Sequence, residues 1–89
     1  MPLYRELYRR YHRQFDELAR SCEPGSDWRK ELRARIGSFE TDVDTLDVDA
    51  ARALREELCS QLEHEAPHCA RPLAREILFA AVKRLEFAG

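Results

Sequence analysis

The sequence predicts an all-α protein: a small antiparallel bundle of four helices, at about residues 3–22, 27–45, 48–66 and 71–87, in one domain spanning 1–89. Apolar residues recur every three or four positions along most of the chain, which is the spacing of one helix face. The 89 residues include only 3 Gly and 4 Pro. Strand-favouring residues never alternate with polar ones over a long run, so the pattern is not that of a β fold.

The first expected helix, residues 3–22, has the clearest pattern. Its apolar side chains fall within an arc of about 120°, and Arg and Glu are prominent on the remaining surface. This stripe comprises Tyr4, Leu7, Tyr8, Tyr11, Phe15, Leu18, Ala19 and Cys22. The helix should end before Pro24 and Gly25, because neither residue continues a helix well.

The second expected helix, residues 27–45, contains one glycine. Gly37 falls opposite the apolar stripe, and a glycine inside a helix costs up to about 1 kcal/mol relative to Ala. The stripe keeps its phase across Gly37, so we expect the helix to continue into the early forties, with a kink or break there as the alternative. The stripe consists of Trp28, Leu32, Ile36, Phe39, Val43 and Leu46.

The third expected helix, residues 48–66, follows a short acidic junction. Asp47 is well placed to cap its first turn, where Asp49 would lie near the positive end of the helix dipole. Pro67 should end this helix. The residues expected to be buried are Val48, Ala51, Leu54, Leu58, Cys59 and Leu62.

The fourth expected helix, residues 71–87, is apolar over about half of its circumference. Pro72 suits its first turn, where a missing backbone donor is not needed. Because this stripe is wider than a peripheral helix needs, a three-helix or hairpin protomer that completes its core by dimerising is an alternative. The stripe comprises Leu73, Ala74, Ile77, Leu78, Ala81, Val82, Leu85 and Ala88.

Phe79 lies on the opposite, charged side of the fourth helix, near Arg75, Lys83, Glu86 and Phe87. A large ring on a polar helix face either packs inside the molecule or contacts a partner. We therefore expect these five residues to form a partner-binding face. The alternative is internal packing of Phe79 against the first helix or the loop at Pro67, and solvent exposure of Phe79 distinguishes the two.

Composition and charge narrow the classes of function. The chain shows no secretory signal and no apolar run long enough to span a membrane, and Cys22, Cys59 and Cys69 lack the C-x-x-C spacing. We therefore expect a cytoplasmic protein. Residues 37–70 carry two cations and nine anions, whereas 1–36 (nine and six) and 71–89 (four and two) are net basic. Such blocks favour contact between its own helices or with a second copy over nucleic acid.

A metal- or redox-responsive site at His64, His68 and Cys69 is an alternative hypothesis. The run from His64 to His68 matches H-E-x-x-H, a zinc motif that needs both histidines on one face of a continuous helix. Pro67 interrupts that face, and the third histidine, His12, is far away in the sequence. No metal or other cofactor is therefore expected.

No catalytic pattern is found. Two cysteines fall on core stripes, so only Cys69, in a Pro-flanked loop beside His68, is a candidate for an exposed reactive thiol. The chain has neither a Gly-rich phosphate loop nor a nucleophilic serine elbow. We expect that the protein is not an enzyme.

The first helix carries exposed cations at Arg5, Arg9 and Arg13, a pattern that could contact phosphates. Acidic residues interrupt this surface, and the sequence pI of about 5.9 lies far below the range usual for nucleic-acid-binding domains. Nucleic-acid binding through the first helix is therefore kept only as an alternative.

The tripeptide Leu3-Tyr4-Arg5, echoed by Leu7-Tyr8-Arg9, resembles the motif of the LYR family of small helical assembly factors. That family also carries a downstream Phe, which here corresponds to Phe39. The resemblance covers about the first half of the chain and implies a helical bundle that binds acyl carrier protein and assists assembly of respiratory or iron–sulfur proteins. The acidic middle segment and the fourth helix depart from the basic three-helix pattern of the family.

Taken together, these patterns predict a small cytoplasmic protein–protein interaction module of the adaptor, chaperone, immunity, antitoxin-like or inhibitor type. It would act through its C-terminal helix on another protein, on a second copy of itself, or on both. No membrane partner is expected.

Overall fold

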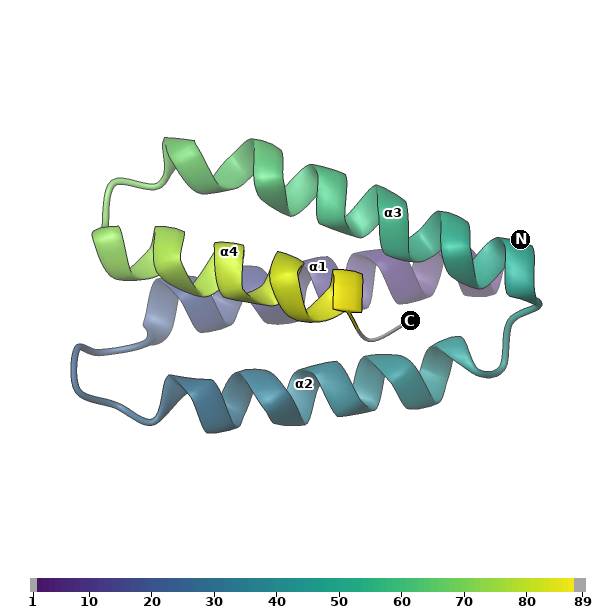
Figure 1. Cartoon of the computed structure of the whole chain (residues 1–89), viewed down its shortest axis with the longest axis horizontal. Helices are drawn as coiled ribbons and strands as arrows, with labels where there is room; N and C mark the ends of the chain where they lie inside the picture. The colour runs from purple at the N-terminus through teal and green to yellow at the C-terminus, as the bar shows by residue number, and fades with distance from the viewer. Residues whose placement is uncertain (1, 88–89) are drawn as a thin grey trace.

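The computed structural model describes residues 2–87, which form four α-helices joined by short turns. Successive helices run in opposite directions along the long axis of the molecule (Figure 1). The predicted all-α, four-helix fold is therefore confirmed. The helices are α1 (Pro2–Ser21), α2 (Trp28–Val43), α3 (Val48–Glu65) and α4 (Pro72–Phe87), with a 3-10 turn, η1 (Ala66–His68), after α3.

The helix ends follow the turn chemistry of the sequence. Gly25 adopts a positive φ of 89°, a conformation that glycine enters without steric cost, and it lies in the turn that separates α1 from α2. Asp47 caps α3 as predicted, because its Oδ1 accepts a hydrogen bond of 2.8 Å from the backbone N–H of Ala50. Pro67 lies in η1, so α3 ends at Glu65, two residues before the proline.

The helix α2 continues through Gly37, as the unbroken apolar stripe predicted. Gly37 is exposed, and a Cβ added at this position would have no heavy atom outside the local helix backbone within 4 Å. Neither helix packing nor backbone geometry therefore requires a glycine here.

Two helices, α1 and α4, each contact all three of the others. By contrast, α2 and α3 are consecutive in the chain but lie at opposite edges of the bundle (Figure 1) and make few contacts. An ion pair joins them, with Arg55 Nη2 donating to Glu40 Oε2 at 3.1 Å, and Arg55 Nη1 also donates to the carbonyl of Leu85 in α4.

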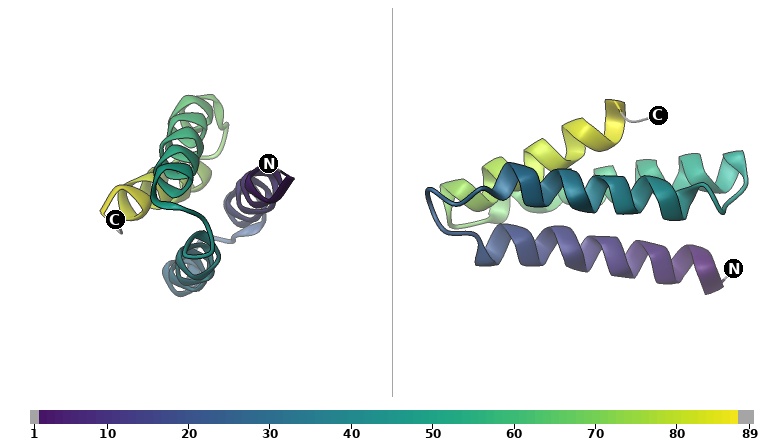
Figure 2. Two further views of the ribbon diagram at one scale, coloured as in Figure 1. Left: turned by 90° about the vertical axis from the view of Figure 1, so that its right-hand side faces the viewer. Right: turned by 90° about the horizontal axis from the view of Figure 1, so that it is seen from below.

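The inclination of α4 distinguishes it from the other helices. Seen along its side, α4 is tilted relative to α1, α2 and α3, and its C-terminal end protrudes from the bundle (Figure 2). Its outer surface is consequently more accessible toward Phe87, while its first turns lie within the bundle.

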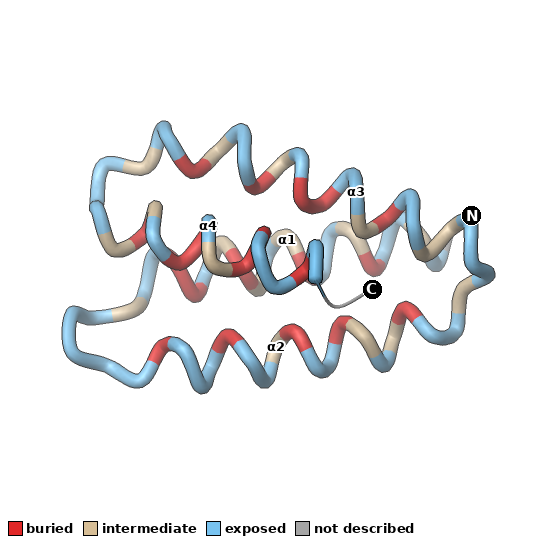
Figure 3. Tube along the Cα trace, viewed as in Figure 1, coloured by how far each residue is buried: buried red, intermediate tan, exposed pale blue. Residues whose placement is uncertain are grey.

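The buried residues follow the predicted stripes and face the inside of the bundle (Figure 3). The rings of Tyr11 and Phe39 meet edge to face, with centroids 5.1 Å apart, and join α1 to α2. The stripe positions Tyr4, Tyr8, Cys22, Leu46, Ala51 and Leu73 are only partly buried. Ala88 lies outside the described residues.

The prediction that Val48 is buried is wrong, because this side chain is 72% exposed. Val48 is the first residue of α3, and the described part of α4 stops short of that end of the bundle (Figure 1). Its flank of α3 therefore has no helix to pack against. Within the described residues, none of the helices is both long and apolar enough to cross a membrane.

Replacing Gly37 with alanine should raise the free energy of unfolding by about 0.5–1 kcal/mol. Alanine fits the helical backbone without a clash and restricts the unfolded chain more than glycine does. Urea denaturation followed by circular dichroism measures the effect.

Gly25→Ala is the matched control. Its positive φ would force an L side chain into the left-handed region, at a cost of about 1 kcal/mol or more. Equal effects of the two substitutions would contradict the continuous helix at Gly37.

Candidate functional site

The outer face of α4 carries two large exposed apolar side chains. Phe79 is 47% exposed and Phe87 is 78% exposed. At about 100° per residue, their eight-residue separation places them about 80° apart on the helix, hence on one side of it. Phe79 is therefore not fully buried in the monomer, although about half of its surface is covered.

The predicted polar neighbours of Phe79 divide into two groups. Lys83 and Glu86 are exposed beside the phenylalanines. Arg75 is partly buried, and its Nη1 donates a hydrogen bond of 2.7 Å to the carbonyl oxygen of Cys69. Arg75 thus fastens the first turns of α4 to the preceding turn, whereas Lys83 and Glu86 are available at the surface.

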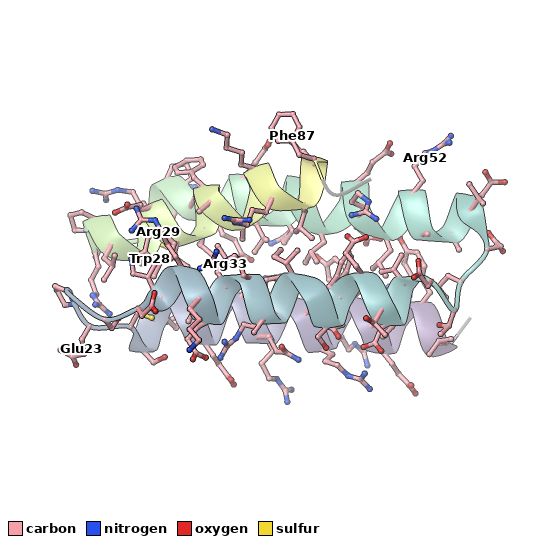
Figure 4. All side chains as sticks on the ribbon, turned by 60° about the horizontal axis from the view of Figure 1, so that its bottom comes forward. Glu23, Trp28, Arg29, Arg33, Arg52 and Phe87 are labelled. Atoms are coloured by element: carbon pink, nitrogen blue, oxygen red, sulfur yellow. The ribbon has the colours of Figure 1, made fainter. Side chains whose placement is uncertain are left out.

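A groove of about 540 Å³ adjoins this face between α2 and α4. Figure 4 shows Trp28, Arg29 and Arg33 along the side of α2 nearest α4, and Phe87 projecting from the end of α4. The lining residues are Trp28, Arg29, Leu32, Ile36, Ala80, Lys83, Arg84 and Phe87. Sequence analysis did not predict this groove, because Trp28, Leu32 and Ile36 belong to an ordinary core stripe and nothing local shows that α4 tilts away from α2.

The charged residues that line the groove are all cations: Arg29, Lys83 and Arg84. The Arg29 guanidinium lies 4.4 Å from the Trp28 ring centroid, a cation–π distance, and 3.3 Å from the Glu76 carboxylate. Among residues 2–87, Lys83 and Arg84 take part in no ion pair, and both are exposed.

A second hollow, of about 730 Å³, brings all three histidines to one region of the surface. His12 of α1 reaches across to α3, where its Nε2 lies 2.8 and 2.9 Å from the two carboxylate oxygens of Glu65. The rings of His64 and His68 meet edge to face with centroids 5.6 Å apart, and Cys69 lies in the same lining. His12 and Glu65 are far apart in the sequence, so residue spacing did not predict that His12 lies near His64 and His68.

This cluster does not have the geometry of the zinc motif. In that motif the glutamate acts as a base, but here Glu65 is occupied by His12 and by Gln61, whose Nε2 donates to it at 2.6 Å. His68 lies in η1 rather than in α3. Across the described part of the chain, no three His, Cys, Asp or Glu side chains are arranged to hold a metal ion.

The cysteines differ in accessibility. Cys59 is buried against α4, and burial raises the pKa of its thiol to about 11, which keeps it protonated and unreactive. Cys69 is only partly exposed, with its Sγ 3.7 Å from the carbonyl oxygen of Glu65. The predicted core location of Cys59 is confirmed, and the thiol at Cys69 is less accessible than a freely exposed one.

The basic surface of α1 has exposed cations without accessible stacking partners. Arg5, Arg9 and Arg13 are exposed. Tyr11, however, is fully buried and hydrogen-bonded to Asp42, and Tyr8 is partly buried and stacked on His12.

Of the residues that resemble the LYR motif, Tyr4 and Phe39 make contacts within the bundle, whereas Leu3 and Arg5 are exposed. The hydroxyl of Tyr4 donates a 2.6 Å hydrogen bond to Glu57, and burial together with this bond raises the pKa of Tyr4 to about 12. Phe39 is fully buried.

No known protein family, characterised protein or solved structure matches the chain.

The His12–Glu65 contact should make the protein sensitive to acid. Burial raises the pKa of Glu65, but hydrogen bonds from Gln61 and His12 and the charges of His12 and Arg20 outweigh it, so the pKa lies below its ordinary value of 4.5. A depressed carboxyl pKa stabilises the folded state above the unfolded-state pKa, and this contribution disappears as pH falls through the folded-state value. Glu65→Gln should therefore flatten the decline of unfolding free energy between about pH 5 and pH 3.

The measurement is urea denaturation at a series of pH values. Glu63→Gln provides the control, because Glu63 is exposed on the same helix and forms no ion pair within the described residues. Parallel pH profiles for wild type and Glu65→Gln would show that this contact does not contribute.

Proposed function

We propose that this protein is an interaction module that binds another protein through the outer face of α4. The observation that carries the proposal is the pair of exposed rings, Phe79 and Phe87, on one side of a helix whose opposite side forms the core. Single exposed apolar residues are common on soluble proteins. Two large exposed rings on one side of a helix, with the exposed Lys83 between them, resemble the mixture of aromatic and charged residues found at protein interfaces.

The packing that holds α4 in place favours a binding role for its outer face. A binding face gains affinity when it is already held in its bound conformation, because less conformational entropy is lost on association. The inner side of α4 packs on all three other helices, and Arg75 holds its first turns to the carbonyl of Cys69. The two rings are therefore presented from a fixed backbone rather than from a loop.

In such a face, a few residues are expected to contribute most of the binding free energy. Aromatic residues are enriched among the few interface positions at which truncation costs about 2 kcal/mol or more, and exposed charges around them set orientation rather than affinity. Phe79 and Phe87 are the candidates for anchors. Lys83 and Glu86 are the candidates for the surrounding polar rim.

Affinity capture from the native cell, with wild type and the Phe79→Asp/Phe87→Asp variant as baits, tests this function. A genuine partner should be recovered with wild type and lost with the variant. Its binding to the purified protein, measured by isothermal titration calorimetry, should weaken by about 30-fold or more.

Val48→Asp is the matched control. Val48 is 72% exposed, but it lies on α3 rather than on the outer face of α4, and Asp suits the first turn of a helix. Both variants should keep the wild-type circular dichroism spectrum. The unfolding midpoint of the α4 variant should fall slightly, because about half of Phe79 is covered in the monomer, so binding is compared well below both midpoints. Recovery of every partner by the α4 variant would contradict the proposal.

A further inference from the structure

We propose that His64 and His68 form a two-imidazole site for a divalent transition-metal ion, with Zn²⁺ as the probe that tests it. His64 belongs to the last turn of α3, and His68 ends η1. The site lies at the end of the bundle where the chain passes from α3 to α4 (Figure 1). The inference is independent of the function proposed for the outer face of α4.

The chain brings the two rings together although Pro67 lies between them in the sequence. Pro67 ends α3, but Ala66 keeps helical backbone angles, φ −54° and ψ −46°, and the 3-10 turn η1 continues the helical path. Residues four apart are neighbours on a helix surface. The two ring centroids consequently lie 5.6 Å apart, so the proline does not prevent both imidazoles from reaching one ligand.

The separation of the rings suits a shared metal ion. A zinc–nitrogen bond is about 2.0–2.1 Å long, and the ring centroid lies roughly 1 Å beyond the nitrogen, so two imidazoles on one tetrahedral ion have centroids roughly 5 Å apart. The observed 5.6 Å is close to this value. The rings meet edge to face, and a rotation about χ2, which is a broad torsion in histidine, is needed to direct one nitrogen of each ring at a common point.

Both imidazoles are available for a ligand. His64 and His68 are exposed, and, unlike His12, which contacts Glu65, neither forms a side-chain hydrogen bond or an ion pair within residues 2–87. Neutral imidazole is a preferred ligand of zinc, copper and nickel. No third His, Cys, Asp or Glu side chain of the described residues completes a metal site, so water would fill the remaining positions. Such a site exchanges its metal and is not structural.

The charge around the two histidines favours a cation. Segment 37–70 carries two cations and nine anions, and Glu63 is exposed next to His64. Arg20 and Arg71 line the same hollow, but Arg20 forms an ion pair on its own helix and Arg71 donates to carbonyl oxygens at the end of α1. An excess of negative charge raises the local concentration of cations.

Titration of the wild-type protein, without a histidine tag, with Zn²⁺ at about pH 7.5 tests the site, because ordinary imidazoles are mostly neutral there. Calorimetry should show one-to-one binding with a dissociation constant of roughly 1–100 µM, since only half of the usual four ligands come from the protein. The imidazole NMR signals of His64 and His68 should shift together, by more than those of His12. Binding weaker than about 1 mM would overturn the proposal.

Substitution of either ligand provides the decisive comparison. His64→Gln and His68→Gln should each weaken Zn²⁺ binding by about tenfold or more and should keep the wild-type circular dichroism spectrum, because both side chains are exposed. His12→Gln is the matched control: it removes the third histidine of the hollow and should leave the affinity within about twofold of wild type. Equal effects of all three substitutions would overturn the proposal.

Two further measurements distinguish imidazole ligands from the other donors nearby. Thiolates bind zinc strongly, and Cys69 lines the same hollow. Cys69→Ser should leave the affinity unchanged, and loss of binding in this variant would assign the metal to the thiol and overturn the proposal. Mg²⁺ prefers oxygen ligands, so about a hundredfold excess should not displace Zn²⁺. Displacement would indicate a carboxylate site and would also overturn the proposal.

Discussion

The fold depends on the burial of the inner side of α4 against the three other helices. Because α2 and α3 make few contacts with each other, they are joined through α1 and α4, and Ile77, Leu78 and Leu85 on the inner side of α4 are almost fully buried. Complete burial of such a side chain contributes about 1.5–3 kcal/mol. Core packing therefore fixes the position of α4, and the backbone that carries its outer face is held in place by the same packing.

Arginine holds the periphery of this arrangement together. Arg71 donates to the carbonyls of Arg20 and Cys22 at the end of α1, Arg75 donates to that of Cys69, and Arg55 links Glu40 to the carbonyl of Leu85. A guanidinium offers several donors in a fixed plane, so one side chain satisfies two acceptors from different segments. These contacts join the start and end of α4 to α1, α2 and α3. A lysine could not satisfy two acceptors in this way, because its ammonium group lacks the planar, forked donors of arginine.

The local sequence pattern correctly predicted helix continuity and capping, which depend on neighbouring residues. It did not predict features that depend on contacts between distant segments. The stripe across Gly37 correctly predicted a continuous helix, and Asp47 was correctly assigned as a cap. The burial of Val48 was predicted wrongly, because periodicity records which way a side chain points but not whether another helix extends that far. The contact of His12 with Glu65 likewise depends on the relative placement of α1 and α3, which no spacing encodes.

The exposure of Phe79 and Phe87 is not explained by the requirements of folding. Phenylalanine has a lower helix propensity than Ala, Leu, Arg or Lys, so local helix formation favours other residues at exposed positions. Neither ring belongs to the buried core, and the inner side of α4 is already filled by aliphatic residues. A substitution at Phe87 should therefore act on binding with little effect on stability, whereas a substitution at the half-covered Phe79 should affect both. This partial separation makes the outer face of α4 a stronger candidate for function than the histidine cluster, in which Glu65 and His12 also join α1 to α3.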